Sequence, residues 1–353
     1  MKYEVAIIGG GPAGASCAIE LAKHGVYPLI FDYSHPREKP CGGGISIQVI
    51  KEFPFLEGFC SLGFAFSDFK IITYNDIEVM TKKHEYGFCV SRMLFDQGIL
   101  SMAVEKGARL IAEKVLDVTK VSQGWKIITN KGLHFAKIIV GADGANSIVR
   151  RRIIGPISNE NLALTFGYRA IGKDVQATIK LLGEIPGYIW VFPGKNYVNI
   201  GVGSELNYGS MLKKILDKFI YSHYSGLKII SSYAALLPSA KTPEFFSVPC
   251  CGEDWVLVGD AAGHVDPTTG GGIFYALSGG RLAALAIKDN EVNSYDALWR
   301  KEFGNALIKS AKRKGHFYDP VHSTISILLG LANKTFIMSG DTKECPQKDI
   351  EKK

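Results

Sequence analysis

The sequence has no apolar run that approaches the roughly 20 residues needed to cross a bilayer, so it predicts no membrane-spanning helix. Its start, Met1-Lys2-Tyr3, leads directly into a short apolar strand and lacks the pattern of a secretory leader. Cysteine is sparse: the seven residues are odd in number and form no C-x-x-C pair, which argues against a disulfide framework and against a zinc site. We therefore expect a cytoplasmic protein without a metal centre.

A large excess of charge is also lacking. The 353 residues include 41 basic and 34 acidic side chains, and the resulting net charge of +7 is modest, so we expect no nucleic-acid partner. The charge fits contact with an anionic membrane surface or an acidic protein, and equally a solvated basic surface. An apolar content of 46% is ordinary for a globular protein, and the length suffices for two or three cores.

What the sequence does contain is a glycine-rich loop near its start. The loop Gly9-Gly10-Gly11-Pro12-Ala13-Gly14 follows an apolar run and precedes a helix pattern, and the next strand ends in Asp32. In dinucleotide-binding folds the first glycine makes a tight turn, the second admits a pyrophosphate, and the third lets helix and strand pack closely. Asp32 suits an unphosphorylated ribose, because a carboxylate accepts from its hydroxyls. The pattern predicts a site for FAD or NAD.

The rest of the chain is organised around a second strand–loop–helix pattern, in residues 255–284. Its apolar run ends at Gly259-Asp260, and a helix pattern begins at Ile273 after the run Gly270-Gly271-Gly272. Backbone N–H groups at such a helix start face an anion or an electron-rich ring edge. A third strand-end loop, residues 141–144, carries another acid and two glycines. Because strand ends on one side of a parallel sheet converge, the three loops predict one shared ligand site.

Two further segments hold candidate ligand contacts. Residues 35–45 include two prolines and the run Gly42-Gly43-Gly44, so they form an irregular loop with Cys41 at its bend. Cys41 is either a ligand-facing thiol or a small buried hydrophobe. Ser91 is expected to cap a helix, and Arg92 in its first turn opposes the helix dipole. Arg92 is therefore either held there by an anion or a solvated surface residue.

An aromatic cluster marks the middle of the chain. Tyr188, Trp190 and Phe192 alternate with aliphatic residues, which places all three on one face of a strand. This face is either plain core or the wall of a hydrophobic substrate site. Beyond it, residues 236–248 suggest an irregular segment because they contain two prolines, and Arg150, Arg151 and Arg152 suggest a solvated helix face.

Two helices are expected near the C-terminus. Residues 295–314 predict a basic amphipathic helix, and residues 321–337 a shorter apolar one that either packs on the core or touches a membrane surface. Residues 341–353 are polar and are expected to fray.

The combination of loops resembles the flavoproteins of the aromatic-hydroxylase type, and within them the geranylgeranyl reductase family. G-G-G-P-A-G, G-A-D-G and G-D-A-A-G with the later G-G-G-I carry the resemblance to the fold, over residues 1–290. K-P-C-G-G-G at 39–44 and P-G-Y-I-W-V-F-P at 186–193 carry the resemblance to the reductases. The first proline of the second motif stands one place nearer the tyrosine than in the family pattern.

The resemblance implies an α/β fold: a Rossmann-like FAD-binding domain of the p-hydroxybenzoate-hydroxylase type, with an inserted α+β substrate domain on an antiparallel sheet. We assign residues 1–60, 86–155 and 250–290 to the FAD-binding domain and residues 61–85 and 156–249 to the substrate domain. Residues 291–340 would form C-terminal helices and 341–353 a polar tail.

The resemblance also implies roles for single residues around a non-covalent FAD. Gly9, Gly11, Pro12, Ala13, Gly14 and Asp32 would bind the ADP half, Arg92 the pyrophosphate or ribityl region, and Asp260 a ribityl hydroxyl. Gly270, Gly271, Gly272 and Ile273 would lie at the pyrimidine edge of the flavin, and Cys41, Gly42 and Gly43 near its face. Tyr188, Trp190 and Phe192 would line the lipid. Cys41 is the candidate proton donor, and His264 a weaker one that otherwise only packs.

The implied function is FAD-dependent reduction of carbon–carbon double bonds in the isoprenoid chains of lipids. An alternative in the same fold is a flavin monooxygenase, a hydroxylase or epoxidase acting on a hydrophobic substrate, and a weaker one is a flavin-binding module without turnover. Expected partners are a prenyl lipid and an electron donor, either ferredoxin or NAD(P)H, with peripheral membrane contact as a further possibility. A second G-x-G-x-x-G for a separate nicotinamide domain is missing.

Overall fold

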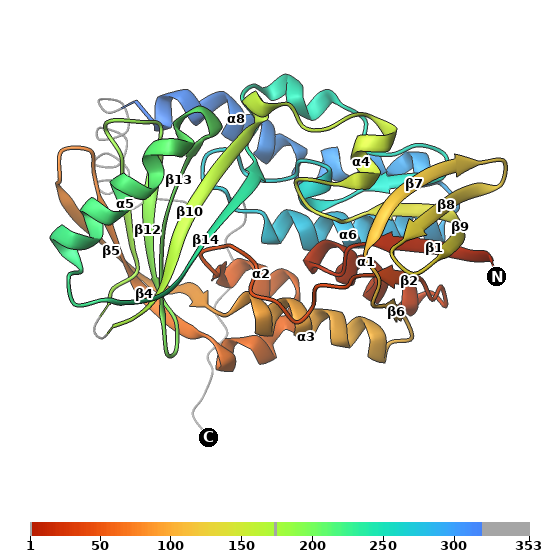
Figure 1. Cartoon of the computed structure of the whole chain (residues 1–353), viewed down its shortest axis with the longest axis horizontal. Helices are drawn as coiled ribbons and strands as arrows, with labels where there is room; N and C mark the ends of the chain where they lie inside the picture. Colours follow the sequence, from red (N-terminus) through yellow and green to blue (C-terminus); the bar gives the residue numbers. More distant parts are fainter. Residues whose placement is uncertain (1, 173–174, 320–353) are drawn as a thin grey trace.

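A computed structural model describes residues 2–172 and 175–319, and in it two β-sheets lie side by side (Figure 1). The first sheet has seven strands with a parallel centre. Its order is β6 (Arg109–Ile111), β2 (Leu29–Phe31), β1 (Lys2–Ile8), β9 (Leu133–Gly141), β8 (Gly124–Thr129) and β7 (Val115–Val121), and β15 (Trp255–Leu257) pairs with β9. Strands β7 and β8 form an antiparallel extension of this sheet.

Three strands of this sheet end at one edge. The register pairs Ile8 with Gly141 and Gly141 with Leu257, so β1, β9 and β15 finish side by side. The three loops of the sequence therefore begin at neighbouring points, as expected for parallel strands.

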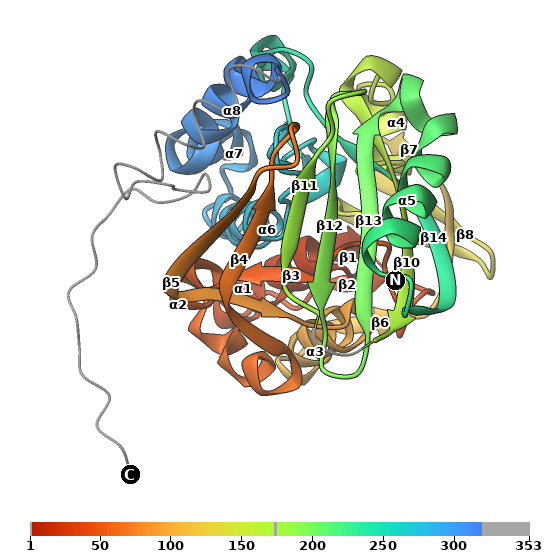
Figure 2. The ribbon, with the colours of Figure 1, turned by 90° about the vertical axis from the view of Figure 1, so that its left-hand side faces the viewer.

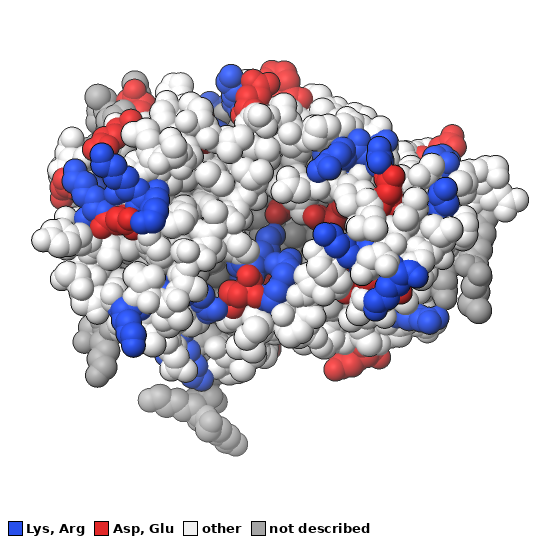
Figure 3. Space-filling model, viewed as in Figure 1, with Lys and Arg blue, Asp and Glu red and all other residues white. Residues whose placement is uncertain are grey.

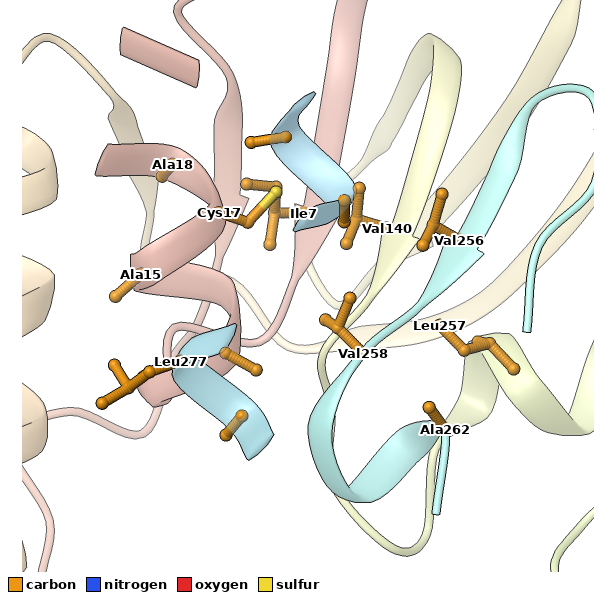
Figure 4. Close-up of a cluster of buried hydrophobic side chains, with 14 of the residues drawn as sticks. Ile7, Ala15, Cys17, Ala18, Val140, Val256, Leu257, Val258, Ala262 and Leu277 are labelled. Atoms are coloured by element: carbon orange, nitrogen blue, oxygen red, sulfur yellow. The ribbon is translucent and has the colours of Figure 1, made fainter. Parts of the chain in front are cut away.

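Three helices lie beside this sheet: α1 (Pro12–Lys23), α3 (Arg92–Glu105) and α6 (Ile273–Lys288). Figure 4 shows side chains of α1, α6 and three central strands, among them Ile7, Val140 and Leu277, meeting in one buried cluster. Helices α1 and α6 pack very closely: a methyl group on Gly280 would lie 2.2 Å from Ala13 O. Their N-termini are thereby fixed next to the strand ends.

The second sheet has eight strands, mostly antiparallel. Its order is β14 (Lys228–Pro238), β10 (Leu162–Ile171), β13 (Val198–Glu205), β12 (Gly187–Pro193), β11 (Thr178–Leu181), β4 (Phe64–Ile72), β5 (Glu78–Cys89) and β3 (Gly44–Ser46). Helix α5 (Gly209–His223) covers its outer face (Figures 1 and 2). The apolar residues Leu212 and Leu216 of α5 share a buried cluster there with Ile189 and Val191 of β12. Tyr188, Trp190 and Phe192 of β12 point to the opposite face, because side chains on a strand alternate.

Some expected boundaries differ from the structure. Strand β3, within residues 1–60, pairs with β5 in the second sheet, and β5 itself runs on to Cys89. The segment expected to be irregular from Leu236 continues β14 to Pro238, because β14 is an edge strand and a proline at its end interrupts no ladder.

The helix expected over residues 295–314 is divided. It consists of α7 (Tyr295–Trp299), a π turn (Arg300–Gly304) and α8 (Asn305–Phe317); the short helices α2 (Ile47–Glu52) and α4 (Ile148–Ile153) lie elsewhere. The expected apolar helix 321–337 and the polar tail lie outside the described residues. Within residues 2–172 and 175–319, no helix is long and apolar enough to cross a membrane.

Candidate active site

The first glycine loop has the geometry that a dinucleotide requires. Gly9 has φ +103°, and a methyl group there would lie 2.4 Å from Ala142 O. A methyl group on Gly14 would lie 2.0 Å from Gly9 O, whereas one on Gly11 would meet no atom within 4 Å. At Gly9 and Gly14 a side chain would therefore clash with neighbouring backbone, whereas Gly11 faces free space at the start of α1. No side chain caps this helix, so its first N–H groups are available to a phosphate.

Asp32 is held as a carboxylate beside this loop. Its oxygens accept from Gly10 N, Ser34 N and Ser34 Oγ, each at 2.7 Å, and His35 Nδ1 lies 3.1 Å away. Burial by itself would raise the pKa of Asp32, but these donors together lower it well below its usual range. An ionised acceptor at the end of β2 suits the ribose role that the sequence predicts.

Arg92 is paired inside the protein. Its guanidinium donates to both oxygens of Asp96, one turn along α3, at 2.7 and 2.9 Å, and only 3% of the residue is exposed. The interpretation of Arg92 as a solvated surface residue is therefore wrong, and the anion that holds it is Asp96. A contact of Arg92 with the cofactor stays a prediction.

The start of α3 is capped from a distance. Ser91 stands at the N-cap position, as expected, but its hydroxyl donates to Glu38 instead of accepting from the helix. Glu38 Oε1 accepts from Arg92 N at 2.9 Å, and Arg169 of β10 lies 2.8 Å from Oε2. Glu38 thus ties the loop before Cys41 to helix α3 and to strand β10. Glu38 has no signature in the sequence, because a cap supplied from a distant loop leaves no local pattern.

An ion pair and side-chain hydrogen bonds hold the loops after β15. Asp260 lies in the turn at Gly259, which has φ +58°, and Lys39 Nζ is 3.1 Å from Asp260 Oδ2. Further on, Asp266 Oδ1 accepts from Thr268 N and Thr269 N at 2.9 and 2.8 Å. This Asp-Pro turn leads to Gly272, the uncapped start of α6. Asp266 was missed, although an aspartate before a proline and a glycine run is a turn signal.

The aromatic face of β12 meets these loops. Tyr188 donates through its hydroxyl to Thr269 O, and the Phe192 ring lies against Gly42, where a methyl group would be only 2.8 Å from it. Trp190 lies between these two residues on the strand and is 5% exposed. Tyr188, Trp190 and Phe192 therefore share one face, opposite the aliphatic face that packs on α5. Figure 3 shows a hollow between the two sheets, with acidic and basic side chains around it.

Cys41 stands where the two sheets meet. Its Sγ accepts from Gly43 N at 3.4 Å and interacts with the guanidinium of Arg92. Its carbonyl oxygen accepts from Asn199 Nδ2 of β13 at 2.7 Å, a contact across 158 residues that no local pattern predicts. The thiol is half-buried. Cys41 thus lies beside both the glycine run 42–44 and the aromatic face.

His264 does not fit a proton donor. Its side chain is fully buried among Trp299, Phe303 and Tyr295, with Cys250 Sγ 3.8 Å from Nε2. Burial and the nearby arginines Arg300 and Arg150 lower the pKa of His264 to about 3, so the ring is neutral at physiological pH. Of the two readings of His264, the structure favours packing.

Arg150 also departs from expectation. It is 4% exposed, donates to Ala261 O at 3.2 Å and lies over the Phe245 ring, whereas Arg152 is exposed and pairs with Asp117. Arg150 thus holds the loop that carries Asp260 by a hydrogen bond to its backbone. In the described part of the chain, no group of histidine, cysteine, aspartate and glutamate side chains is arranged to hold a metal ion.

Comparison with known proteins identifies the chain. The family described as an FAD binding domain matches residues 2–45. Digeranylgeranylglycerophospholipid reductase from Thermoplasma volcanium is 31% identical over 343 residues, covering 89% of this chain and 85% of that protein. Its counterpart from Thermoplasma acidophilum is 30% identical, with 88% and 85% covered. The chain belongs to the geranylgeranyl reductase family. It is an FAD-dependent oxidoreductase with the p-hydroxybenzoate-hydroxylase type of fold, as the sequence predicts.

Solved structures agree with this placement in the geranylgeranyl reductase family. A geranylgeranyl bacteriochlorophyll reductase-like protein from Thermoplasma acidophilum superimposes with a TM-score of 0.83 at 26% identity, covering 96% of this chain and 94% of that one. A flavin-dependent brominase superimposes with a TM-score of 0.70 at 21% identity, which shows a shared fold alone. FAD is therefore the cofactor, and the open space at Gly11, the ionised Asp32 and the uncapped starts of α1 and α6 fit it.

Proposed function

We propose that this family member reduces carbon–carbon double bonds in the prenyl chains of lipids. The observation that carries the proposal is the contact of the aromatic face of β12 with the loops at Cys41 and Thr269. An apolar wall that abuts both flavin-side loops can hold a flat, apolar chain against the cofactor. Relatives named digeranylgeranylglycerophospholipid reductase and geranylgeranyl diphosphate reductase support the choice of a prenyl substrate.

Reduction of an isolated alkene adds a hydride to one carbon and a proton to the other. FAD, when bound and reduced, supplies the hydride and both electrons. The chain must supply the proton and a site that excludes water, because an unactivated alkene has no carbonyl to take up charge.

We assign the proton to the thiol of Cys41. Gly43 N–H and the Arg92 guanidinium both face its sulfur, so they stabilise the thiolate that remains after the proton leaves. Tyr188, Trp190 and Phe192 would bury the prenyl chain on the same side.

We propose the remaining FAD contacts from the geometry of the glycine loops and from the family of the chain. Gly9, Gly11 and Asp32 would take the ADP half, and Asp260 would exchange its contact with Lys39 for one with a ribityl hydroxyl. The N–H groups at Gly270–Ile273 would face the pyrimidine edge of the flavin, where positive dipoles stabilise negative charge.

Two partners complete the proposal. Electrons would come from ferredoxin or from NAD(P)H bound transiently, since the sequence has no second G-x-G-x-x-G. The net charge of +7 and the lipid substrate are both consistent with peripheral contact with an anionic membrane.

The function is tested by product mass analysis under strict anaerobiosis. Chemically reduced enzyme is mixed with phospholipids or diphosphates that carry geranylgeranyl chains, and each reduced double bond should add two hydrogens without O2. A product that forms only in air and gains one oxygen would establish the monooxygenase instead. Absence of any product with FAD-loaded enzyme and every prenyl lipid tried would favour a flavin-binding module.

The role of Cys41 has its own test. Cys41→Ser should keep FAD and its reduction by dithionite, yet slow alkene reduction by at least about 10²-fold, the lower end of general-acid effects. Single-turnover kinetics of pre-reduced enzyme isolate this step from electron delivery. Cys251→Ser, at another half-buried cysteine, is the control and should turn over normally. Wild-type turnover by Cys41→Ser would make Cys41 a packing residue.

A further inference from the structure

The side chain of Asn199, in strand β13 of the second sheet, holds the backbone of Cys41 by a hydrogen bond. It is 4% exposed and is paired in register with Phe192 of β12. Its Oδ1 accepts from Trp190 Nε1 at 2.9 Å and from Tyr233 Oη at 2.6 Å, and its Nδ2 donates to Cys41 O at 2.7 Å. The amide oxygen thus accepts two hydrogen bonds, and the amide nitrogen donates one to the loop that carries Cys41.

These partners fix the orientation of the amide. Trp190 Nε1 can only donate, so the group facing it must be the amide oxygen, and Nδ2 is necessarily turned toward Cys41. The tyrosine hydroxyl adds a second donor on the oxygen side. An amide flipped by 180° would lose the bond from Trp190 and face the Cys41 carbonyl with a second carbonyl.

A row of residues across four strands makes this arrangement possible. Tyr233 of β14, Gly167 of β10, Gly201 of β13 and Trp190 of β12 are successive register partners. A methyl group on Gly167 would lie 2.5 Å from the Tyr233 ring, and one on Gly201 would lie 2.2 Å from the Trp190 ring. The two aromatic rings therefore lie over the two glycines, and both donate to Asn199, which stands two residues from Gly201 on the same face.

We propose that Asn199 is a positioning residue for the proton donor. This inference rests on the proposed function and on Cys41 as the acid. The three glycines after Cys41 give its loop much freedom, and Gly43 has φ +77°. A hydrogen bond to the carbonyl of Cys41 restricts the peptide that carries the thiol. Because the same amide holds Trp190, one side chain sets both the proton donor and the wall that the alkene would contact.

The test uses FAD-loaded full-length enzyme in anaerobic single turnovers with a geranylgeranyl lipid. Asn199→Asp keeps an acceptor for Trp190 and Tyr233 but presents oxygen to the Cys41 carbonyl, and Asn199→Ser is too short to reach it. Both should keep FAD and its dithionite reduction and slow alkene reduction by about tenfold or more, as misplaced catalytic groups do. Tyr168→Phe removes a 2.6 Å hydrogen bond to Asp217 on the opposite face of the sheet and should leave the rate unchanged.

A double-mutant cycle separates positioning from general damage. Asn199→Asp keeps the acceptor for Trp190, so in the Cys41→Ser background it should change the residual rate less than about twofold, because the proton donor that Asn199 positions is gone. Full additivity, an unchanged rate in both single variants, or loss of FAD from both would overturn the proposal. A wild-type enzyme that reduces no prenyl lipid would instead refute the proposed function, so the two failures are distinguishable.

Discussion

Two glycines of the first loop should separate cofactor binding from folding when each is replaced by alanine. Gly11 has φ −68°, which alanine adopts freely, and its new methyl group would meet no protein atom within 4 Å. The methyl group of Gly14→Ala would lie 2.0 Å from Gly9 O and 3.0 Å from Ile7 Cγ2. The same chemical change therefore enters free space in one case and a packed backbone in the other.

The expected magnitudes follow from these contacts. At Gly14 the gain in helix propensity is about 1 kcal/mol, but overpacking costs about 1–3 kcal/mol and more against backbone, so the fold is destabilised. At Gly11 the apo-protein should lose at most about 1 kcal/mol, because alanine is a poorer N-cap than glycine. The methyl group would however occupy the space of the pyrophosphate, and FAD affinity should fall at least tenfold, about 1.4 kcal/mol.

Thermal unfolding of both apo-proteins and FAD titration of each provide the measurement. Gly14→Ala should unfold several degrees below the wild type, and Gly11→Ala close to it while binding FAD weakly. Wild-type FAD affinity in Gly11→Ala would show that no phosphate passes over this residue. Wild-type stability in Gly14→Ala would refute the close packing of α1 on β1.

Three further outcomes are expected. Trp190→Ala should weaken prenyl-lipid binding by the loss of an aromatic contact worth about 1.5–3 kcal/mol and should keep its FAD content. Ile189→Ala, on the face toward α5, should lower stability without changing lipid affinity. Loss of FAD in Trp190→Ala with no separate effect on lipid binding would show that Trp190 is a core residue. Asp260→Ala should weaken FAD binding ten- to a hundredfold, or about 1.5–3 kcal/mol, and Lys39→Ala should not; equal losses in both would assign the effect to their ion pair. The pKa of Asp32 is lowered in the folded protein, so its contribution to stability is complete above the unfolded pKa of about 3.9 and is lost as pH falls below that value. The difference in unfolding temperature between wild type and Asp32→Asn should therefore shrink between pH 5 and 3. A constant difference would contradict the lowered pKa.

The local sequence pattern was sufficient to predict the glycine loops and the face on which strand side chains lie. The alternation at 188–192 placed three aromatic side chains together because side chains on a strand alternate, whatever surrounds it. The spacing of Gly9, Gly11 and Gly14 predicted the turn, the opening and the close packing because each is a property of a few consecutive residues. The convergence of the three glycine loops followed from parallel strands, whose ends share an edge.

Only the tertiary structure decided which charged and polar groups meet. The sequence left open whether an anion holds Arg92 or whether it is solvated. Burial decided this, because it turned Arg92 toward Asp96 within its own helix. Glu38 caps α3 across 54 residues of sequence, and Asn199 reaches Cys41 across 158. Such bonds form where the fold brings atoms distant in sequence within about 3 Å, and short-range periodicity carries no information about that distance. The sequence by itself thus determined the geometry of the glycine loops, and the packing of one sheet against the other determined what holds the backbone of Cys41.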